Sequence, residues 1–377
     1  MTISTFSFPT TIHFGSGSSS LVAGHLTSIG VERPLVVTDA GVAATPWFVE
    51  WAATINGGTV FSGVTGNPTA SQVRAGVDAY AAAGADGVVG IGGGAALDVA
   101  KAVALMATHP GELWDYEDEV RDARPITDAV APLLALPTTA GTGSEVGRSA
   151  VIADDTTHVK RIVFSPHLLP RVVFADPELT LGLPPAITAA TGMDALTHNV
   201  EAYLARGYHP ICDGIALEGL RLAHDHLAVA VAEPLDVHAR AGMLMSSMMG
   251  AIAFQKGLGV VHSTAHALGT LVDLHHGLAN AVMIDHALEV NVEAVPERFA
   301  TMAATVGLVD ATPEGFLRWL ADLKAEIGIP RSLLDTEIDP AETEHLVNLS
   351  FQDTCHLNNP VAVTPADFDA IFARAFA

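Results

Sequence analysis

The first half of this chain alternates between two kinds of segment, and the second half does not. Up to about residue 180, short runs rich in β-branched residues are separated by segments rich in alanine and glycine. The runs that predict strands are Pro34–Thr38, Thr59–Val64, Gly87–Ile91, Pro132–Leu136, Val151–Ala153 and Val172–Ala175. Between them, Ala70–Ala83 and Ala95–Ala107 have the spaced apolar positions of helices. This alternation predicts an α/β domain with a mainly parallel sheet.

The strand pattern ends near Pro184–Pro185. No convincing strand run follows, and the apolar spacing predicts helices over Ala186–Leu204, Ile211–Ala230, Val237–Phe254 and Glu342–Leu349. Asp-Pro at 176–177 and Pro-Pro at 184–185 favour a structural boundary there. Because 377 residues are enough for two cores, we predict an α/β domain over 1–180 and an all-α domain over 181–377.

Composition excludes several classes of partner. The chain has 18 basic and 42 acidic residues, a net charge of −24 that disfavours nucleic acid and anionic membranes. Residues 1–31 lack the basic start of a signal peptide, and the other uncharged stretches are too short to span a membrane. Cys212 and Cys355 form no disulfide framework and no C-x-x-C pair. Together these features predict a cytoplasmic protein.

A glycine-rich turn lies between a predicted strand and a predicted helix. Gly92, Gly93 and Gly94 would let backbone N–H groups approach a pyrophosphate, at a helix end that carries partial positive charge. A Rossmann unit would have its ribose-binding acid about 20 residues later. Here Asp39, which follows the strand Pro34–Thr38, is the better candidate, and its charge would repel a 2′-phosphate. The alternatives are a tight turn of any α/β protein and a turn-forming aspartate.

A second loop strengthens the dinucleotide hypothesis. Residues 137–146 follow another predicted strand and concentrate small and hydroxyl residues, among them Thr138, Thr139 and Thr142. Two such loops after strands of one sheet favour a bound dinucleotide.

Several of the histidines are spaced for a metal site. Asp194 and His198 are four residues apart in a predicted helix, His262 and His266 repeat this spacing, and His276 follows. A spacing of four residues puts two side chains on one helix face. Imidazoles with a carboxylate suit Fe²⁺ or Zn²⁺. Each residue alone could be an ordinary core or surface residue, but unpaired polar groups are costly to bury in apolar helices, which favours a metal site.

At this point the sequence resembles the iron-containing, or group III, alcohol dehydrogenases over almost its whole length. The matching segments are Phe14–Ser18, Thr38–Asp39, Asn67–Thr69, Gly92–Gly94 with Asp98 and Lys101, Pro137–Val146, Asp176–Thr180, Gly192–His198, Glu201–Tyr203 and Gly259–Ala281. The resemblance implies a dehydroquinate synthase-like architecture: an N-terminal dinucleotide-binding α/β domain and an all-α metal-binding domain. It also implies NAD, a divalent ion (Fe²⁺ favoured, Zn²⁺ the alternative) and a homo-oligomer, a dimer or larger.

The resemblance assigns roles to individual residues. It implies that the metal ligands are Asp194, His198, His262 and His276. It places His266 near the nicotinamide and the substrate, as the catalytic residue. The cofactor contacts that it implies are Asp39, Asn67, Gly93, Gly94, Asp98, Thr138, Thr139, Thr142, Lys160 and Leu179.

The function that these features predict is NAD(H)-linked interconversion of a small alcohol and its aldehyde or ketone. The alternatives are a maleylacetate reductase-like enzyme, a dehydroquinate synthase-type lyase and a non-enzymatic protein. The lyase is disfavoured because its phosphate-bearing substrates call for several basic residues, and residues 180–300 contain few. The family often has Ser, Thr and Pro where Ala95, Gly147 and His275 stand, which leaves the substrate open.

Two features predict the kind of substrate. The Met- and Phe-containing segment Met243–Phe254 would wall the metal site with apolar bulk, which favours a short primary alcohol, a diol or an ω-substituted chain. Arg148, just after the second loop, is a candidate for holding an anionic tail, and a surface position is the alternative.

Overall fold

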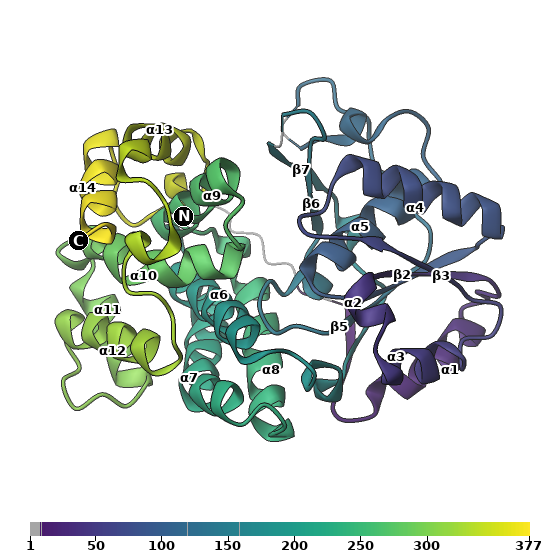
Figure 1. Cartoon of the computed structure of the whole chain (residues 1–377), viewed down its shortest axis with the longest axis horizontal. Coiled ribbons are helices and arrows are strands. Elements are labelled where there is room, and N and C mark those ends of the chain that lie inside the picture. Colours follow the sequence, from purple (N-terminus) through teal and green to yellow (C-terminus); the bar gives the residue numbers. More distant parts are fainter. Residues whose placement is uncertain (1–7, 9, 119, 158) are drawn as a thin grey trace. The chain divides into compact units, whose positions relative to one another are not determined.

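The computed structural model describes residues 8, 10–118, 120–157 and 159–377 of the chain (Figure 1). The chain divides into two compact units. The first consists of residues 10–139 and 143–180, apart from the two undescribed positions within them, and the second contains 140–142 and 181–377.

A parallel sheet forms the centre of the first unit. Its six strands lie in the order β1-β8-β5-β4-β2-β3, and each neighbouring pair is parallel. The strands are β1 Thr11–Phe14, β2 Pro34–Asp39, β3 Thr59–Val64, β4 Gly87–Gly92, β5 Leu133–Pro137 and β8 Val172–Ala175. A separate antiparallel hairpin consists of β6 Ser149–Ala153 and β7 Lys160–Phe164.

Helices cover both faces of this sheet, as Figure 1 shows. The helices of this unit are α1 Val22–Ser28, α2 Ala40–Ala43, α3 Pro46–Ala52, α4 Ala70–Ala83 and α5 Gly94–Met106. On β2, Leu35 and Val37 pack into the core cluster formed with α4 and α5, whereas Val36 packs into the cluster formed with α1 and α3. Because both faces are covered, the central strands read as continuous apolar runs rather than alternating ones.

The second unit is helical. Its α-helices are α6 Pro185–Leu204, α7 Pro210–Ala232, α8 Val237–Ala253, α9 Val260–Val272, α10 His276–Val292, α11 Pro296–Thr305, α12 Pro313–Glu326, α13 Thr343–Gln352 and α14 Pro365–Ala375. No strand occurs between residues 181 and 377, all of which are described. Proline opens several of these helices, where its missing N–H costs no hydrogen bond.

These observations confirm the predicted fold class. Every predicted strand and helix is present, with its ends within three residues of the prediction. Two strands, β1 and β7, were not predicted from the sequence; both are short and partly exposed, and they carry polar residues among the apolar ones. Among the described residues, no single helix is long and apolar enough to cross a membrane; one pair, Val237–Lys256 with Val260–Val272, reaches that length and composition only together, across a bend of 105°.

Candidate metal centre and cofactor pocket

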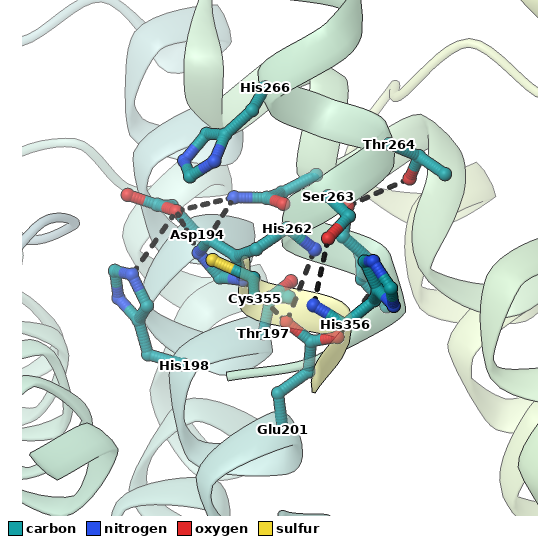
Figure 2. Close-up of polar contacts among 12 residues, drawn as sticks. Asp194, Thr197, His198, Glu201, His262, Ser263, Thr264, His266, Cys355 and His356 are labelled. Atoms are coloured by element: carbon teal, nitrogen blue, oxygen red, sulfur yellow. Dashed lines mark hydrogen bonds and ion pairs between the residues drawn. The ribbon is translucent and has the colours of Figure 1, made fainter. Parts of the chain in front are cut away.

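Three helices of the second unit bring the four predicted metal ligands together. Asp194 and His198 lie one turn apart on α6, His262 lies on α9, and His276 is the first residue of α10. One donor atom from each of the four lies within 4.8 Å of the others. The Nε2 atoms of His198, His262 and His276 lie 3.8, 3.9 and 3.4 Å from the same oxygen, Oδ1 of Asp194. Figure 2 shows His198 and His262 directed towards this carboxylate.

The protonation states of two of these residues suit a divalent ion. Burial opposes ionisation of Asp194, but the charges of the surrounding imidazoles and the Asn280 hydrogen bond outweigh it and lower its pKa to about 2. Burial lowers the pKa of His198 to about 4, although Asp194 acts in the other direction. At neutral pH the carboxylate is therefore charged and the His198 imidazole is neutral, which are the forms that bind metals.

The side chain of Asn280 supplies a test of whether a divalent ion fits this cluster. Its Nδ2 lies 2.8 Å from Asp194 Oδ1, 3.3 Å from His262 Nε2 and 3.2 Å from His276 Nε2. Among the described residues, its buried Oδ1 has no hydrogen-bond partner. The amide nitrogen thus lies among three of the four donor groups, and the amide leaves its own oxygen unsatisfied, which is costly in a protein interior. Three imidazoles and a carboxylate fit Fe²⁺ or Zn²⁺ at this point.

Glu201 holds His262 in place from the side opposite Asp194. Its buried carboxylate accepts hydrogen bonds from His262 Nδ1 at 2.5 Å and from the backbone N–H groups of Val261 and His262 at 2.7 and 3.2 Å. Burial alone would lower the pKa of His262, but the Glu201 hydrogen bond raises it overall. With the Nδ1 hydrogen held by Glu201, the His262 ring presents Nε2 to the cluster, as expected where a carboxylate orients a metal-binding histidine.

Replacing Glu201 with glutamine is expected to weaken binding of a divalent ion about 10- to 100-fold, the usual cost of losing a group that orients a ligand. Glutamine retains one acceptor for the backbone but loses the charge that holds the His262 ring. Competition with a chelator of known affinity would measure the change. Glu218→Gln is the matched control, since Glu218 pairs with Arg221 on the exposed face of α7. Equal ion affinity in both variants would contradict this role of Glu201.

His266, the predicted catalytic residue, lies beside the four predicted ligands and outside their cluster. It is one turn after His262 on α9, its ring stacks on that of His276 with centroids 5.4 Å apart, and its side chain is 33% exposed. Its Nδ1 lies 2.8 Å from Asp353 Oδ2. A partly exposed imidazole next to the ligands is well placed to exchange protons with water.

The structure also shows the contacts of Phe254 and His275, two residues near the predicted ligands. The Phe254 ring, in the short 3₁₀ helix Phe254–Lys256 that follows α8, lies 5.1 Å from the His198 ring between centroids. An aromatic ring therefore contacts one side of the ligand set, which is the position expected from the sequence. His275, whose role was open, caps α10 through a hydrogen bond that it accepts from the Leu278 backbone at 3.4 Å.

The glycine-rich turn of the first unit borders a pocket of about 380 Å³ at the carboxyl ends of β2, β3 and β4. Its lining residues are Asp39, Ala40, Gly41, Val64, Thr65, Gly66, Gly93, Ala95 and Ala96. Gly92 has a φ of +152°, and a Cβ there would lie 2.6 Å from the Ala96 side chain, so the turn requires glycine. Open parallel sheets bind their ligands at this edge.

The aspartate that ends β2 caps a helix and also lines this pocket. Asp39 caps α2, because its Oδ1 accepts a hydrogen bond of 2.9 Å from Val42 N, and it also lines the pocket. Its other oxygen lies 3.3 Å from the position that a Cβ on Gly92 would occupy. Asp39 therefore presents a carboxylate oxygen beside the glycine turn.

The remaining predicted cofactor residues fall into two groups. Gly94 begins α5, Thr138 N donates to Gly92 O at 2.9 Å, and Thr139 lies against Gly93, so these three adjoin the pocket. The other five do not line the pocket. Asn67 precedes α4, Asp98 lies on α5 and Lys160 begins β7. Thr142 belongs to the helical unit, and Leu179 packs into the core cluster formed with α1 and α3.

Asp98 has its oxygens engaged inside the first unit. It accepts hydrogen bonds from Ser144 Oγ at 2.6 Å and Val151 N at 3.0 Å, and it pairs with the buried Lys101 at 3.5 Å. These contacts tie α5 to the second loop and to β6.

Comparison with known proteins agrees with this combination of a helical metal cluster and a glycine-rich pocket on a parallel sheet. Two protein-family models match the chain. The one for iron-containing alcohol dehydrogenase matches residues 9–177, and the one for the C-terminal part of the Fe-containing alcohol dehydrogenase family matches residues 188–376. A 4-hydroxybutyrate dehydrogenase from Cupriavidus necator is 40% identical over 370 residues, 95% of this chain and 96% of that protein.

Solved structures give the same result. The chain superposes on a 1,3-propanediol oxidoreductase with a TM-score of 0.93 and 34% identity, over 99% of this chain and 100% of the other. It superposes on the sulfoacetaldehyde reductase of Bifidobacterium kashiwanohense in complex with NAD⁺ with a TM-score of 0.92 and 29% identity, over 100% and 99% of the two chains. The chain belongs to the iron-containing alcohol dehydrogenase family, and it is an oxidoreductase.

Proposed function

We propose that this chain interconverts a short primary alcohol and its aldehyde with NAD(H), using Fe²⁺ or, as the alternative, Zn²⁺. The observation that carries the proposal is the convergence of Asp194, His198, His262 and His276 in one buried cluster. A relative that binds NAD⁺ and the pocket beside Asp39 support the choice of cofactor.

In this proposal, the four clustered residues and His266 have separate roles. The four clustered residues hold the ion, which would lower the pKa of an alcohol hydroxyl when bound. NAD⁺ would accept the hydride that leaves the alcohol carbon. His266 accepts the hydroxyl proton and releases it to water, because its side chain lies beside the ligands and is partly exposed. One alcohol and one NAD⁺ thus give one aldehyde, one NADH and one proton.

The proposed substrate is short and carries a polar or anionic group at its far end. The Phe254 ring against His198 would limit the bulk that fits beside the ligands. The similar proteins named for 4-hydroxybutyrate, 1,3-propanediol and sulfoacetaldehyde act on small ω-substituted molecules by their names. Arg148, whose guanidinium lies 5.3 Å from the centre of the Phe164 ring, remains the candidate for an anionic end.

A panel of alcohols tests the function. Sustained NADH formation is expected with 1,3-propanediol or 4-hydroxybutyrate, and a lower kcat/KM with bulky secondary alcohols. Higher kcat/KM for the secondary alcohols would reject the narrow site, and unchanged 4-hydroxybutyrate oxidation in Arg148→Ala would reject the role of Arg148. No net NADH with any alcohol would favour the lyase, and turnover of maleylacetate alone would favour the reductase of that substrate.

Light scattering during purification would test the proposed homo-oligomer, a dimer or larger.

Replacing Asp39 with glycine is expected to reduce the preference for NAD⁺ over NADP⁺ about tenfold or more, since 1.4 kcal/mol of lost repulsion corresponds to a factor of ten. Glycine is tolerated as the cap of α2, so the fold is expected to persist. The ratio of kcat/KM for the two cofactors measures the effect. Asp39→Asn is the matched variant, because it keeps a capping oxygen and removes only the charge. An unchanged ratio in both variants would show that Asp39 does not discriminate between the cofactors.

A further inference from the structure

Asp353, which directly follows α13, binds α9 through both of its carboxylate oxygens. Oδ1 accepts hydrogen bonds from Ser263 Oγ at 2.7 Å and from the backbone N–H of Cys355 at 2.8 Å. Oδ2 lies 2.8 Å from Nδ1 of His266. Ser263 Oγ in turn accepts a hydrogen bond of 2.9 Å from His356 N. Figure 2 shows Ser263, His266, Cys355 and His356 in this region.

The two oxygens of Asp353 have separate surroundings. The Oδ1 side joins α9 to the turn at 353–356, through Ser263 and two backbone N–H groups. The Oδ2 side meets the imidazole of His266. A carboxylate can only accept hydrogen bonds, so the ring must carry its hydrogen on Nδ1 and keep the lone pair on Nε2. The ring is partly exposed, and the Asp353 bond together with stacking on His276 restricts its rotation.

We propose that Asp353 is a positioning residue which fixes the tautomer and the orientation of His266, so that Nε2 is the atom that accepts the alcohol proton. This inference rests on the proposed function. The hydroxyl proton moves to Nε2 and then to water, while the Nδ1 hydrogen stays in its bond to Asp353. The ionised carboxylate stabilises the ring when it carries both hydrogens, as a third group does for a histidine base.

The Asp353→Asn variant keeps the hydrogen bonds on the Oδ1 side and changes only the contact with His266. Cys355 N can only donate, so the amide oxygen must stay on the Ser263 and Cys355 side. The amide NH₂ then faces His266 and donates to Nδ1, which moves the ring hydrogen to Nε2 and removes the lone pair needed there. The expected result is a folded protein whose kcat falls about 10²- to 10⁴-fold, the range for loss of a proton-transfer group, with KM near that of the original chain.

Nitrogen NMR of ¹⁵N-histidine-labelled protein without added metal gives a readout that is independent of activity. The His266 signals, identified by their loss in His266→Ala, are expected to change from the Nδ1–H tautomer to the Nε2–H tautomer in Asp353→Asn. Ser263→Ala is the matched control: it removes a donor to the other oxygen, so it should lower the unfolding temperature and leave the His266 tautomer unchanged.

Three outcomes would overturn the inference: an unchanged His266 tautomer in Asp353→Asn, an unchanged kcat, or loss of the fold in that variant but not in Ser263→Ala. Failure of the proposed function is a different result. If the unaltered chain forms no NADH from any alcohol, the proton-transfer role fails with it, whereas the tautomer measurement still decides whether Asp353 positions the ring.

Discussion

Replacing His262 with alanine is expected to yield a folded protein that binds a divalent ion more than about 100-fold more weakly and forms no NADH from the alcohol. The loss should exceed the cost of removing a group that only orients a ligand, because a donor itself disappears. The fold should persist because Glu201 keeps its hydrogen bonds to the backbone N–H groups of residues 261 and 262. A stability loss of about 1–3 kcal/mol is expected for the buried polar contact that disappears.

Metal analysis after dialysis, circular dichroism and turnover would be measured on the same preparation. His345→Ala is the control, since His345 is an exposed residue of α13 and is 58% exposed in its side chain. Full ion occupancy with ordinary turnover in His262→Ala would reject the assignment of the metal centre.

Alanine at His266 is expected to separate ion binding from activity: the ion stays bound, and kcat falls about 10²- to 10⁴-fold. His266 contributes no donor to the four-residue cluster, so ion affinity should change little. In the proposed function, its imidazole instead accepts the proton of the alcohol hydroxyl. Ion content and kcat measured together distinguish this variant from His262→Ala.

The same His345→Ala control applies to this variant, and added free imidazole is expected to restore part of the activity by supplying the missing base. Equal losses of ion and activity in His266→Ala would identify His266 as a ligand. Normal activity would show that another group moves the proton.

Part of the four-residue cluster could be predicted from local sequence spacing. Asp194 and His198 are one helical turn apart, and a second such pair begins at His262, so spacing alone predicted which faces would carry donors. The central strands were equally accessible, since strands covered on both faces are apolar throughout. Choosing His276 rather than His266 as the fourth ligand needed the resemblance to a family.

The residues that hold the cluster in shape follow no local rule. Glu201 reaches His262 across 61 positions, Asn280 reaches Asp194 across 86, and Asp353 reaches His266 across 87. Glu201 does lie on the same face of α6 as Asp194 and His198, seven and three residues away, and this spacing is a local signal that could have found it beside the family match at Glu201–Tyr203. For Asn280 and Asp353, only the packing of α6, α9, α10 and α13 brings the partners together.

The four donors come from three helices, α6, α9 and α10. A bound ion would therefore also act as a reversible cross-link between these helices. The donors Asp194 and His276 are 82 positions apart in the sequence, and an ion that binds all three helices can be held only when the helical unit is folded. Ion binding and folding of this unit are therefore linked equilibria. An ion at about 100 times its dissociation constant adds about 2.7 kcal/mol to the folded state. The stability of the helical unit would thus follow the concentration of free metal around it, whereas the sheet of the other unit is stabilised by its own apolar cores.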